Sequence, residues 1–143
     1  MTAPARRRAE APSYTRSVRE RTLYDVAGGM PFFEALVERF YDGVAGDPAL
    51  LALYPEPDDL TSARRRLALF LAQYWGGPTA YSDERGHPRL RMRHAPFVIG
   101  ADARDRWLHH MRAAVAAADV APDVERALLD YFEMAAEGMR NAD

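Results

Sequence analysis

The most informative segment of this chain reads Arg91-Met92-Arg93-His94-Ala95-Pro96-Phe97. His94 stands in a short helical turn between longer helical patterns. Pro96 disfavours helix at Ala95, so we expect the turn that carries the histidine to end there. A neutral imidazole fixed in this way suits an axial metal ligand, because one ring nitrogen can be anchored while the other binds the metal. Judged alone, however, such a histidine is more often a surface or core residue than a ligand.

The composition indicates one globular domain. The chain has 143 residues, of which 48% are hydrophobic and 28% charged, which is enough for one good core. A net charge of -2 gives no field that would attract nucleic acid or a membrane. The absence of cysteine excludes disulfides, thiolate ligands, iron–sulfur clusters and the Cys-x-x-Cys-His attachment of covalently bound haem.

The chain lacks the usual signals for membranes and export. The apolar run at 113–118 is far too short for membrane insertion, and the N-terminus has no apolar signal core. We therefore expect a cytoplasmic protein. Residues 1–16 mix prolines, arginines and small residues, which predicts a mobile N-terminal extension, followed by a single domain over 17–143. Arg6, Arg7 and Arg8 could contact an acidic partner or nucleic acid, although a solvated tail is the simpler explanation.

After the extension, the sequence predicts helices only. A short helix at 22–27 is stopped by Gly28-Gly29, and apolar residues at three- and four-residue steps predict a helix over 30–45. A short turn follows at 49–53, and Asp59 or Thr61 can cap a helix that ends near Trp75. Residues 79–88 read as a polar linker. Two further helices are expected to open at Asp102 and Asp123.

Conventional catalytic motifs are missing. We find no glycine-rich phosphate loop, no zinc-binding His-Glu-x-x-His and no nucleophile elbow. His109 and His110 are adjacent, so on a helix they point about 100° apart and cannot share one metal. The distinctive feature is a set of aromatic residues with polar tips, namely Tyr41, Tyr54 and Trp107. Either they are ordinary core residues, or they surround a ligand whose polar atom all three can reach.

Several motifs, taken in order, resemble one family. They are Phe40-Tyr41, Tyr54-Pro55, the run from Gln73 to Pro78, the run from Arg85 to Phe97, Trp107, and the run from Asp130 to Ala136. Together they resemble the group II truncated haemoglobins, the O type of actinobacteria, from about Leu23 to Met139. The arginine-bearing N-terminal extension departs from that pattern.

The resemblance implies an all-α truncated globin. Its expected architecture is a two-over-two helical sandwich, with an abbreviated first helix and an irregular segment before the proximal helix. Haem b would lie between the helices without a covalent bond. His94 matches the proximal iron ligand, and Trp107, Tyr41 and Tyr54 match the distal polar residues that stabilise the bound ligand.

Other residues are expected to contact the haem. Ala63 falls where larger globins have a distal histidine, and Leu67 lies one turn further along. Arg91 and Arg93 could pair with the propionates, with Arg66 as a third candidate, although solvated arginines would explain the pattern equally well. The expected apolar contacts are Phe40, Leu53, Leu67, Phe70, Leu71, Phe97, Met111 and Val115.

A polar distal site favours tight binding of dioxygen, nitric oxide and similar small ligands. Donors aimed at a ligand that gains negative charge slow its escape, which argues against bulk oxygen transport. Redox detoxification, as a nitric oxide dioxygenase or a peroxidase, would need an unidentified external reductant. The alternatives are a sensor or store acting through a partner protein, and a haem-free helical interaction module. A homo-oligomer is left open.

Overall fold

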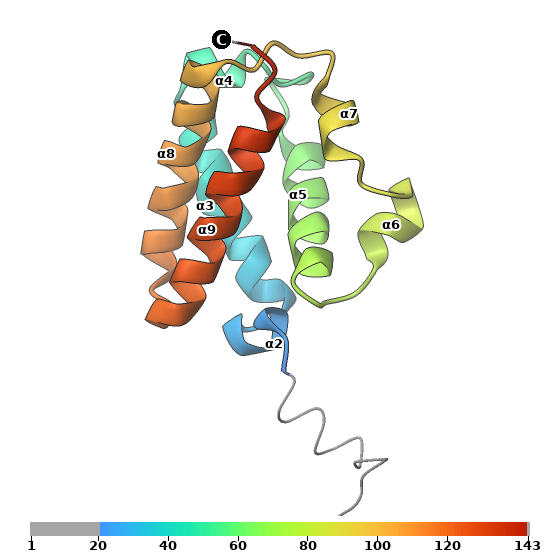
Figure 1. Cartoon of the computed structure of the whole chain (residues 1–143), viewed down its shortest axis with the longest axis vertical. Helices are drawn as coiled ribbons and strands as arrows, with labels where there is room; N and C mark the ends of the chain where they lie inside the picture. Colours follow the sequence, from blue (N-terminus) through green and yellow to red (C-terminus); the bar gives the residue numbers. More distant parts are fainter. Residues whose placement is uncertain (1–20, 143) are drawn as a thin grey trace, which may run out of the picture.

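The computed structural model describes residues 21–142, and all regular structure there is helical (Figure 1). The predicted extension at 1–16 lies outside the described residues. The all-α prediction is confirmed, because no strand occurs within 21–142. The helices are α2 (Leu23–Ala27), α3 (Met30–Ala45), α4 (Pro48–Leu51), α5 (Thr61–Tyr74), α6 (Ala80–Arg85), α7 (Leu90–His94), α8 (Ala101–Ala118) and α9 (Pro122–Met139).

The first described helix is abbreviated, as expected. The Thr22 side chain caps α2 by accepting a hydrogen bond from the backbone N–H of Asp25 at 3.2 Å. Gly28 and Gly29 then adopt φ angles of +126° and +77°, which side chains with a Cβ atom rarely tolerate. The glycine pair therefore ends α2 after five residues and redirects the chain into α3.

The predicted polar linker at 79–88 is partly wrong, because it contains helix α6. The Gln73 amide of α5 holds this helix in place. Its Oε1 accepts from the backbone N–H of Ser82 at 2.9 Å, and its Nε2 donates to the Ser82 hydroxyl at 2.7 Å. These contacts come from another helix, so the local sequence at 79–88 carries no sign of them.

Two expected helix starts are displaced by two residues, because the N-caps are Gly100 and Ala121. α8 begins at Ala101 and α9 at Pro122, so Asp102 and Asp123 lie in the first helical turn and not at the N-cap. An acidic residue in this turn still stabilises the helix dipole. The Asp102 carboxylate also accepts a hydrogen bond from Arg106 at 2.8 Å, one turn further along α8.

The long helices form two layers. α3 packs against α5 and α8, and α8 packs against α9. Figure 1 shows α8 and α9 in front of α3, with α5 to the right of α9, and these four helices form the predicted two-over-two sandwich. The fully buried side chains come from all four of these helices and include Phe33, Phe40, Leu71, Met111, Leu128 and Phe132.

The short helices α6 and α7 lie beside α5 at one side of the sandwich (Figure 1). They leave space between α5, α7 and the upper parts of α8 and α9, and this space is the cavity described below. Within 21–142, no helix combines the length and the apolar character that crossing a membrane requires.

Candidate functional site

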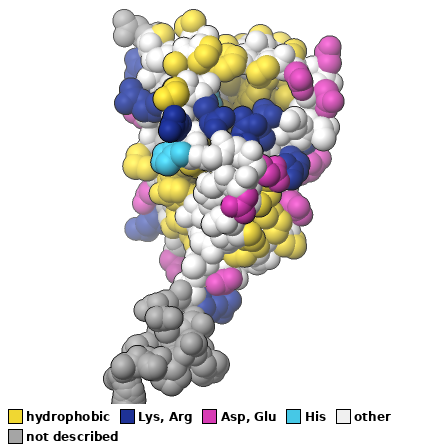
Figure 2. All heavy atoms as spheres, turned by 90° about the vertical axis from the view of Figure 1, so that its right-hand side faces the viewer, with side chains coloured by type: hydrophobic (Ala, Val, Ile, Leu, Met, Phe, Trp, Pro, Cys, Tyr) yellow, Lys and Arg dark blue, Asp and Glu magenta, His cyan; other side chains and the backbone are white. Residues whose placement is uncertain are grey.

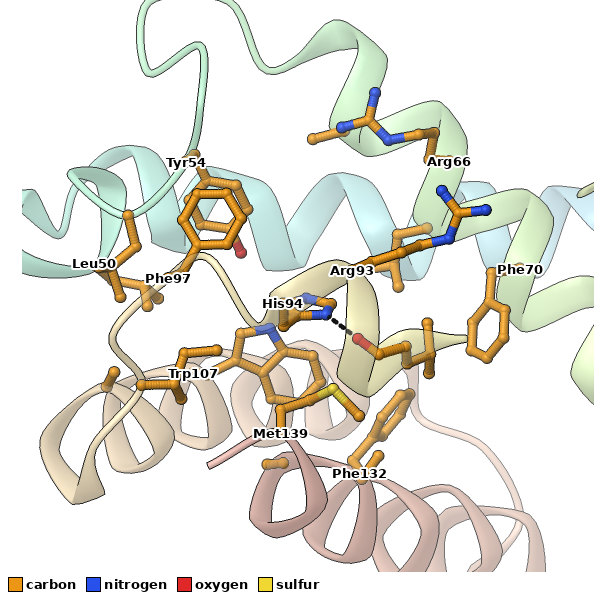
Figure 3. A pocket seen from close by; sticks show the side chains of 18 of the residues that line it. Leu50, Tyr54, Arg66, Phe70, Arg93, His94, Phe97, Trp107, Phe132 and Met139 are labelled. Atoms are coloured by element: carbon orange, nitrogen blue, oxygen red, sulfur yellow. Dashed lines mark hydrogen bonds between the residues drawn. The ribbon is translucent and has the colours of Figure 1, made fainter. Parts of the chain in front are cut away.

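A cavity of about 520 Å³ lies between the helical layers. This volume falls within the usual range for small-molecule and cofactor pockets. Its walls are mainly apolar and aromatic, with His94 of α7 and Trp107 of α8 projecting into it (Figure 3). The lining includes Tyr41, Leu50, Leu53, Tyr54, Ala63, Arg66, Leu67, Phe70, Leu71, Tyr81, Arg85, Leu90, Arg93, His94, Phe97, Ile99, Arg104, Trp107, Tyr131, Phe132 and Met139.

The His94 ring is anchored through one nitrogen. Nδ1 lies 2.7 Å from the backbone carbonyl oxygen of Leu90, drawn as the dashed line in Figure 3. A carbonyl can only accept, so Nδ1 carries a proton, and in the neutral ring Nε2 then keeps its lone pair. Across residues 21–142, Nε2 has no hydrogen-bond partner. This is the arrangement that a neutral histidine needs in order to bind a metal.

The end of α7 is as expected, but the cause differs in part. α7 ends at His94, while Ala95 keeps right-handed helical angles of φ −56° and ψ −35°. Pro96 therefore acts mainly through its missing N–H, which cannot continue the helical hydrogen bonds. The N–H of Ala95 bonds to Met92 O at 3.2 Å and closes the turn. The histidine sits at the end of a short, fixed segment.

The three polar aromatic residues predicted from the sequence do meet in the cavity. Tyr41 is only 5% exposed, and its ring lies 5.7 Å from that of Tyr54. The Trp107 side chain interacts with that of Tyr54, and Tyr54 with Tyr41, closely enough to affect the pKa of the phenols. The trio is therefore a connected polar network within an otherwise apolar wall.

Burial controls the protonation of the two phenols. It raises the pKa of Tyr41 to about 12, against smaller lowering effects from the bond to Tyr54 and from nearby arginines. It also raises the pKa of Tyr54 well above its usual value, and Tyr41 adds to this shift. Both hydroxyls thus keep their protons at neutral pH and can donate hydrogen bonds.

Of the two arginines flanking His94, only Arg93 lines the cavity. Its Nε donates to the Pro88 carbonyl at 2.6 Å and its Nη2 to the Arg85 carbonyl at 2.9 Å. Arg93 therefore braces the backbone before α7 as well as facing the cavity. Arg91 is exposed and lines a shallow depression beyond α7 with Met92 and Val98, so the structure does not bring it to the cavity.

Cationic side chains gather at the open side of the cavity. Figure 2 shows dark blue side chains across this face, next to a yellow hollow. The chain contains no lysine, so each is an arginine. Arg66 and Arg85 line the cavity and form no ion pair within residues 21–142, whereas Arg104 is paired with Asp105 and Glu137. Arg66 and Arg85 are thus free for anionic groups of a ligand.

The predicted apolar contacts divide into two groups. Leu53, Ala63, Leu67, Phe70, Leu71 and Phe97 line the cavity. Phe40, Met111 and Val115 lie in the helical core and are not part of the lining. Sequence reasoning missed Tyr81, Arg85, Ile99, Arg104, Tyr131, Phe132 and Met139 as lining residues. Of these, only Tyr131 follows the helical periodicity of the last predicted helix, and this periodicity does not separate core from cavity wall.

The cavity fits a planar apolar group that carries a metal and carboxylates. His94 offers one metal-binding nitrogen, and the described residues hold no cluster of three or more metal-ligating side chains that could complete a site alone. The metal must therefore bring most of its own ligands, as iron does in haem. Arg66, Arg85 and the remaining Arg93 nitrogen suit the propionates. The fold and the cavity together define a haem-binding globin.

Residues 22–141 match the bacterial-like globin family, and the chain belongs to this family as a group II truncated haemoglobin. It is 38% identical to the group 2 truncated hemoglobin YjbI of Bacillus subtilis over 113 residues, covering 79% of this chain and 84% of that protein. Non-covalent haem is accordingly its cofactor, and dioxygen and other small gas molecules are its ligands.

Solved structures support the same assignment. A thermostable hemoglobin from Thermobifida fusca is 55% identical, with a TM-score of 0.82 over 84% of this chain and 97% of that chain. The hemoglobin of Chloroflexus aurantiacus is 48% identical, also with a TM-score of 0.82, over 85% and 99% of the two chains. The group II truncated hemoglobin of Bacillus anthracis has 36% identity and a TM-score of 0.81, over 85% and 98%.

Proposed function

We propose that this globin binds dioxygen tightly, releases it slowly, and serves in redox removal of nitric oxide or peroxide with electrons from a separate reductant. The observation that carries the proposal is the polar network of Trp107, Tyr54 and Tyr41 inside an apolar cavity. In this proposal His94 is the proximal ligand, and these three residues act on the opposite side.

The haem supplies an iron atom with an open coordination position for a diatomic ligand. Trp107 can only donate, and its single indole N–H serves either Tyr54 or, when a ligand is bound, a ligand oxygen. While Trp107 donates to Tyr54, the Tyr54 hydroxyl donates to the Tyr41 oxygen. The Tyr41 hydroxyl can then donate its own hydrogen to the ligand or to water. Donors fixed in advance stabilise charge that develops on the ligand.

Slow release distinguishes redox function from oxygen delivery. A hydrogen bond to a charged group contributes about 1.5–3 kcal/mol, which corresponds to roughly a ten- to a hundredfold slower dissociation. A ligand retained for this long is available for reaction with a second small molecule. Repeated turnover then depends on an external reductant, since the proposed residues donate hydrogen bonds and not electrons.

The test is stopped-flow kinetics on the ferrous haem protein with dioxygen and then with nitric oxide. We expect slow dioxygen dissociation and rapid, stoichiometric conversion of nitric oxide to nitrate by the dioxygen complex. Fast dissociation with no nitrate would contradict the proposal. Slow dissociation without consumption of nitric oxide or peroxide, together with ligand-dependent binding to another protein, would instead indicate a sensor or store.

A further inference from the structure

Aromatic rings connect the ligand cavity with the protein surface at the end of α5. Tyr131 of α9 lines the cavity, and its ring centroid lies 4.2 Å from that of Tyr74, with 33° between the ring planes. Tyr74 is 49% exposed, and within residues 21–142 it is the only exposed side chain among Phe, Tyr and Trp. A ring in contact with solvent therefore touches a ring that faces the cavity.

On the cavity side, the series of neighbouring aromatic rings continues from Tyr131 to Trp107. Trp107 lies 5.8 Å from Phe132, and Phe132 lies 5.6 Å from Tyr131, measured between ring centroids. Both distances fall within the range of interacting aromatic pairs. The distal tryptophan is thus linked to Tyr131, and through it to Tyr74, by rings alone.

A second series of aromatic rings leads from the cavity to Tyr74. Tyr81 lines the cavity and lies 5.5 Å from Phe70, whose ring is 6.2 Å from that of Tyr74. Trp75 packs against Tyr74 at 5.0 Å, with its ring plane nearly perpendicular. Tyr74 is therefore the exposed point where both branches end, and its half-exposed ring is where a planar phenol can make contact.

The two tyrosines differ in their access to solvent. Oxidation of a phenol to a neutral radical releases one electron and one proton together. Burial raises the pKa of Tyr131 to about 12, and the nearby Tyr74 adds to the shift. Tyr74 is half in water, so solvent can take its proton. A lasting radical is therefore more stable on Tyr74, with Tyr131 as the bridge.

We propose that Tyr131 and Tyr74 form an electron relay from the surface to the cavity, and that Tyr74 is the site where small phenolic reductants are oxidised. The proposal rests on the peroxide-dependent branch of the proposed function. One hydrogen peroxide takes up two electrons and two protons and yields two waters. Two phenols each supply one electron through the relay and release one proton, becoming phenoxyl radicals.

The first test adds hydrogen peroxide to the ferric haem protein without any reductant. Two Tyr74 radicals from separate molecules should then couple, forming a carbon–carbon bond between their rings. We expect covalent dimers with dityrosine fluorescence, together with a tyrosyl signal in electron paramagnetic resonance. Tyr74→Phe keeps the ring and its packing but removes the phenol, so both the dimers and the surface radical should be lost.

Matched variants separate the relay from general damage. Tyr24→Phe alters a tyrosine that stacks on Phe33 away from the cavity, and it should retain the dimers. Tyr131→Phe should slow radical formation at Tyr74, and Tyr74→Phe should also lower the kcat/KM for guaiacol. Dimers that persist at the wild-type level in Tyr74→Phe would overturn the proposal.

A second test does not depend on peroxide chemistry. Zinc protoporphyrin replaces haem, and a light flash in the presence of pentaamminechlorocobalt(III) removes one electron from it irreversibly. We expect transient absorption to show a tyrosyl radical in the wild type and a loss of this signal in Tyr74→Phe. Equal signals in both would refute the relay. A normal signal here, with no peroxide consumption by the haem protein, would contradict only the peroxide branch of the proposed function.

Discussion

At the scale of single residues, the site divides its work between the two sides of the cavity. His94 presents a free Nε2 because the Leu90 carbonyl holds its Nδ1 proton. Trp107, Tyr54 and Tyr41 bring hydrogen-bond donors to an otherwise apolar space. We propose that His94 decides whether the metal is held, and that the trio decides how long a ligand stays.

Trp107→Phe is expected to speed dioxygen dissociation more than Tyr54→Phe. The indole N–H has no acceptor role, so its loss removes a donor outright, worth roughly ten- to a hundredfold in rate. In Tyr54→Phe, Trp107 loses its present acceptor and becomes fully available to the ligand. Stopped-flow dissociation rates for both variants, with Tyr24→Phe as the control, would refute this order if the tryptophan variant showed no change.

These residue roles could be predicted from the sequence only in part. Tyr41 stood out because it lies on the apolar face of a clear helical stripe, and His94 because Pro96 follows it. The bond from Arg93 to Pro88 could not be foreseen, since the same arginine spacing also fits a solvated surface. Tyr131 could not be assigned to the cavity wall, because helical periodicity is the same for a core and for a cavity wall.

At the scale of the helices, α3, α4 and α8 are joined by a buried polar cluster. Asp47 is 9% exposed and caps α4 through the N–H of Leu50 at 3.3 Å. It also accepts from His110 Nε2 at 2.8 Å and from Arg106 at 3.1 Å. Asp47 and His110 are 63 residues apart. No local sequence pattern could have predicted this contact, because the two residues come from distant parts of the chain. Helix α6 was missed for the same reason, since Gln73 of α5 holds it in place.

Asp47 is expected to make the stability of the fold depend on acid. The hydrogen bond from His110 is the main cause that holds the pKa of Asp47 below its usual value. A lowered folded pKa means that the stabilisation is complete above the ordinary carboxyl pKa of about 4 and is lost as pH falls through the folded value. In Asp47→Asn, the Tm should fall less than in the wild type as the pH is lowered through the acid part of a Tm-against-pH curve. An unchanged acid limb would contradict this role.

Gly43→Ala should destabilise the protein, although alanine favours helices. A Cβ atom at this position would lie 2.5 Å from Nδ1 of His110 and 3.3 Å from its Cβ, so turning the ring does not relieve the clash. Overpacking costs about 1–3 kcal/mol, which exceeds the helix gain of about 1 kcal/mol. Urea unfolding measures the balance. The expected fall in midpoint should be smaller when His110→Ala is also present, and a raised midpoint for Gly43→Ala alone would disprove the clash.

At the scale of the whole molecule, the cavity lies inside the sandwich and shares its walls with the core. Phe70, Leu71 and Phe132 are buried in the helical core and also line the cavity. The fold class and the general position of the haem follow from the sequence, because periodicity and the ordered motifs do not depend on exact contacts. The shape of the cavity does depend on them, and it needed the structure.

Haem should therefore stabilise the entire fold. A ligand that binds only the folded state adds about 4 kcal/mol when its free concentration is a thousand times its Kd. For a chain of this size, that corresponds to a rise in Tm of roughly 10 °C. Calorimetry of the apoprotein and of the reconstituted protein measures the difference. Identical melting curves would show that the cavity is not the haem site.

The most direct measurement is a haem titration of the wild type, His94→Gly and His87→Gly, followed by the Soret absorption. His87 is exposed and does not line the cavity, so its variant should bind haem as the wild type does. We expect His94→Gly to bind haem far more weakly and to recover both affinity and spectrum when free imidazole is added. A His94→Gly protein that binds haem as tightly as the wild type, with the same spectrum, would contradict the assignment of His94 as the proximal ligand.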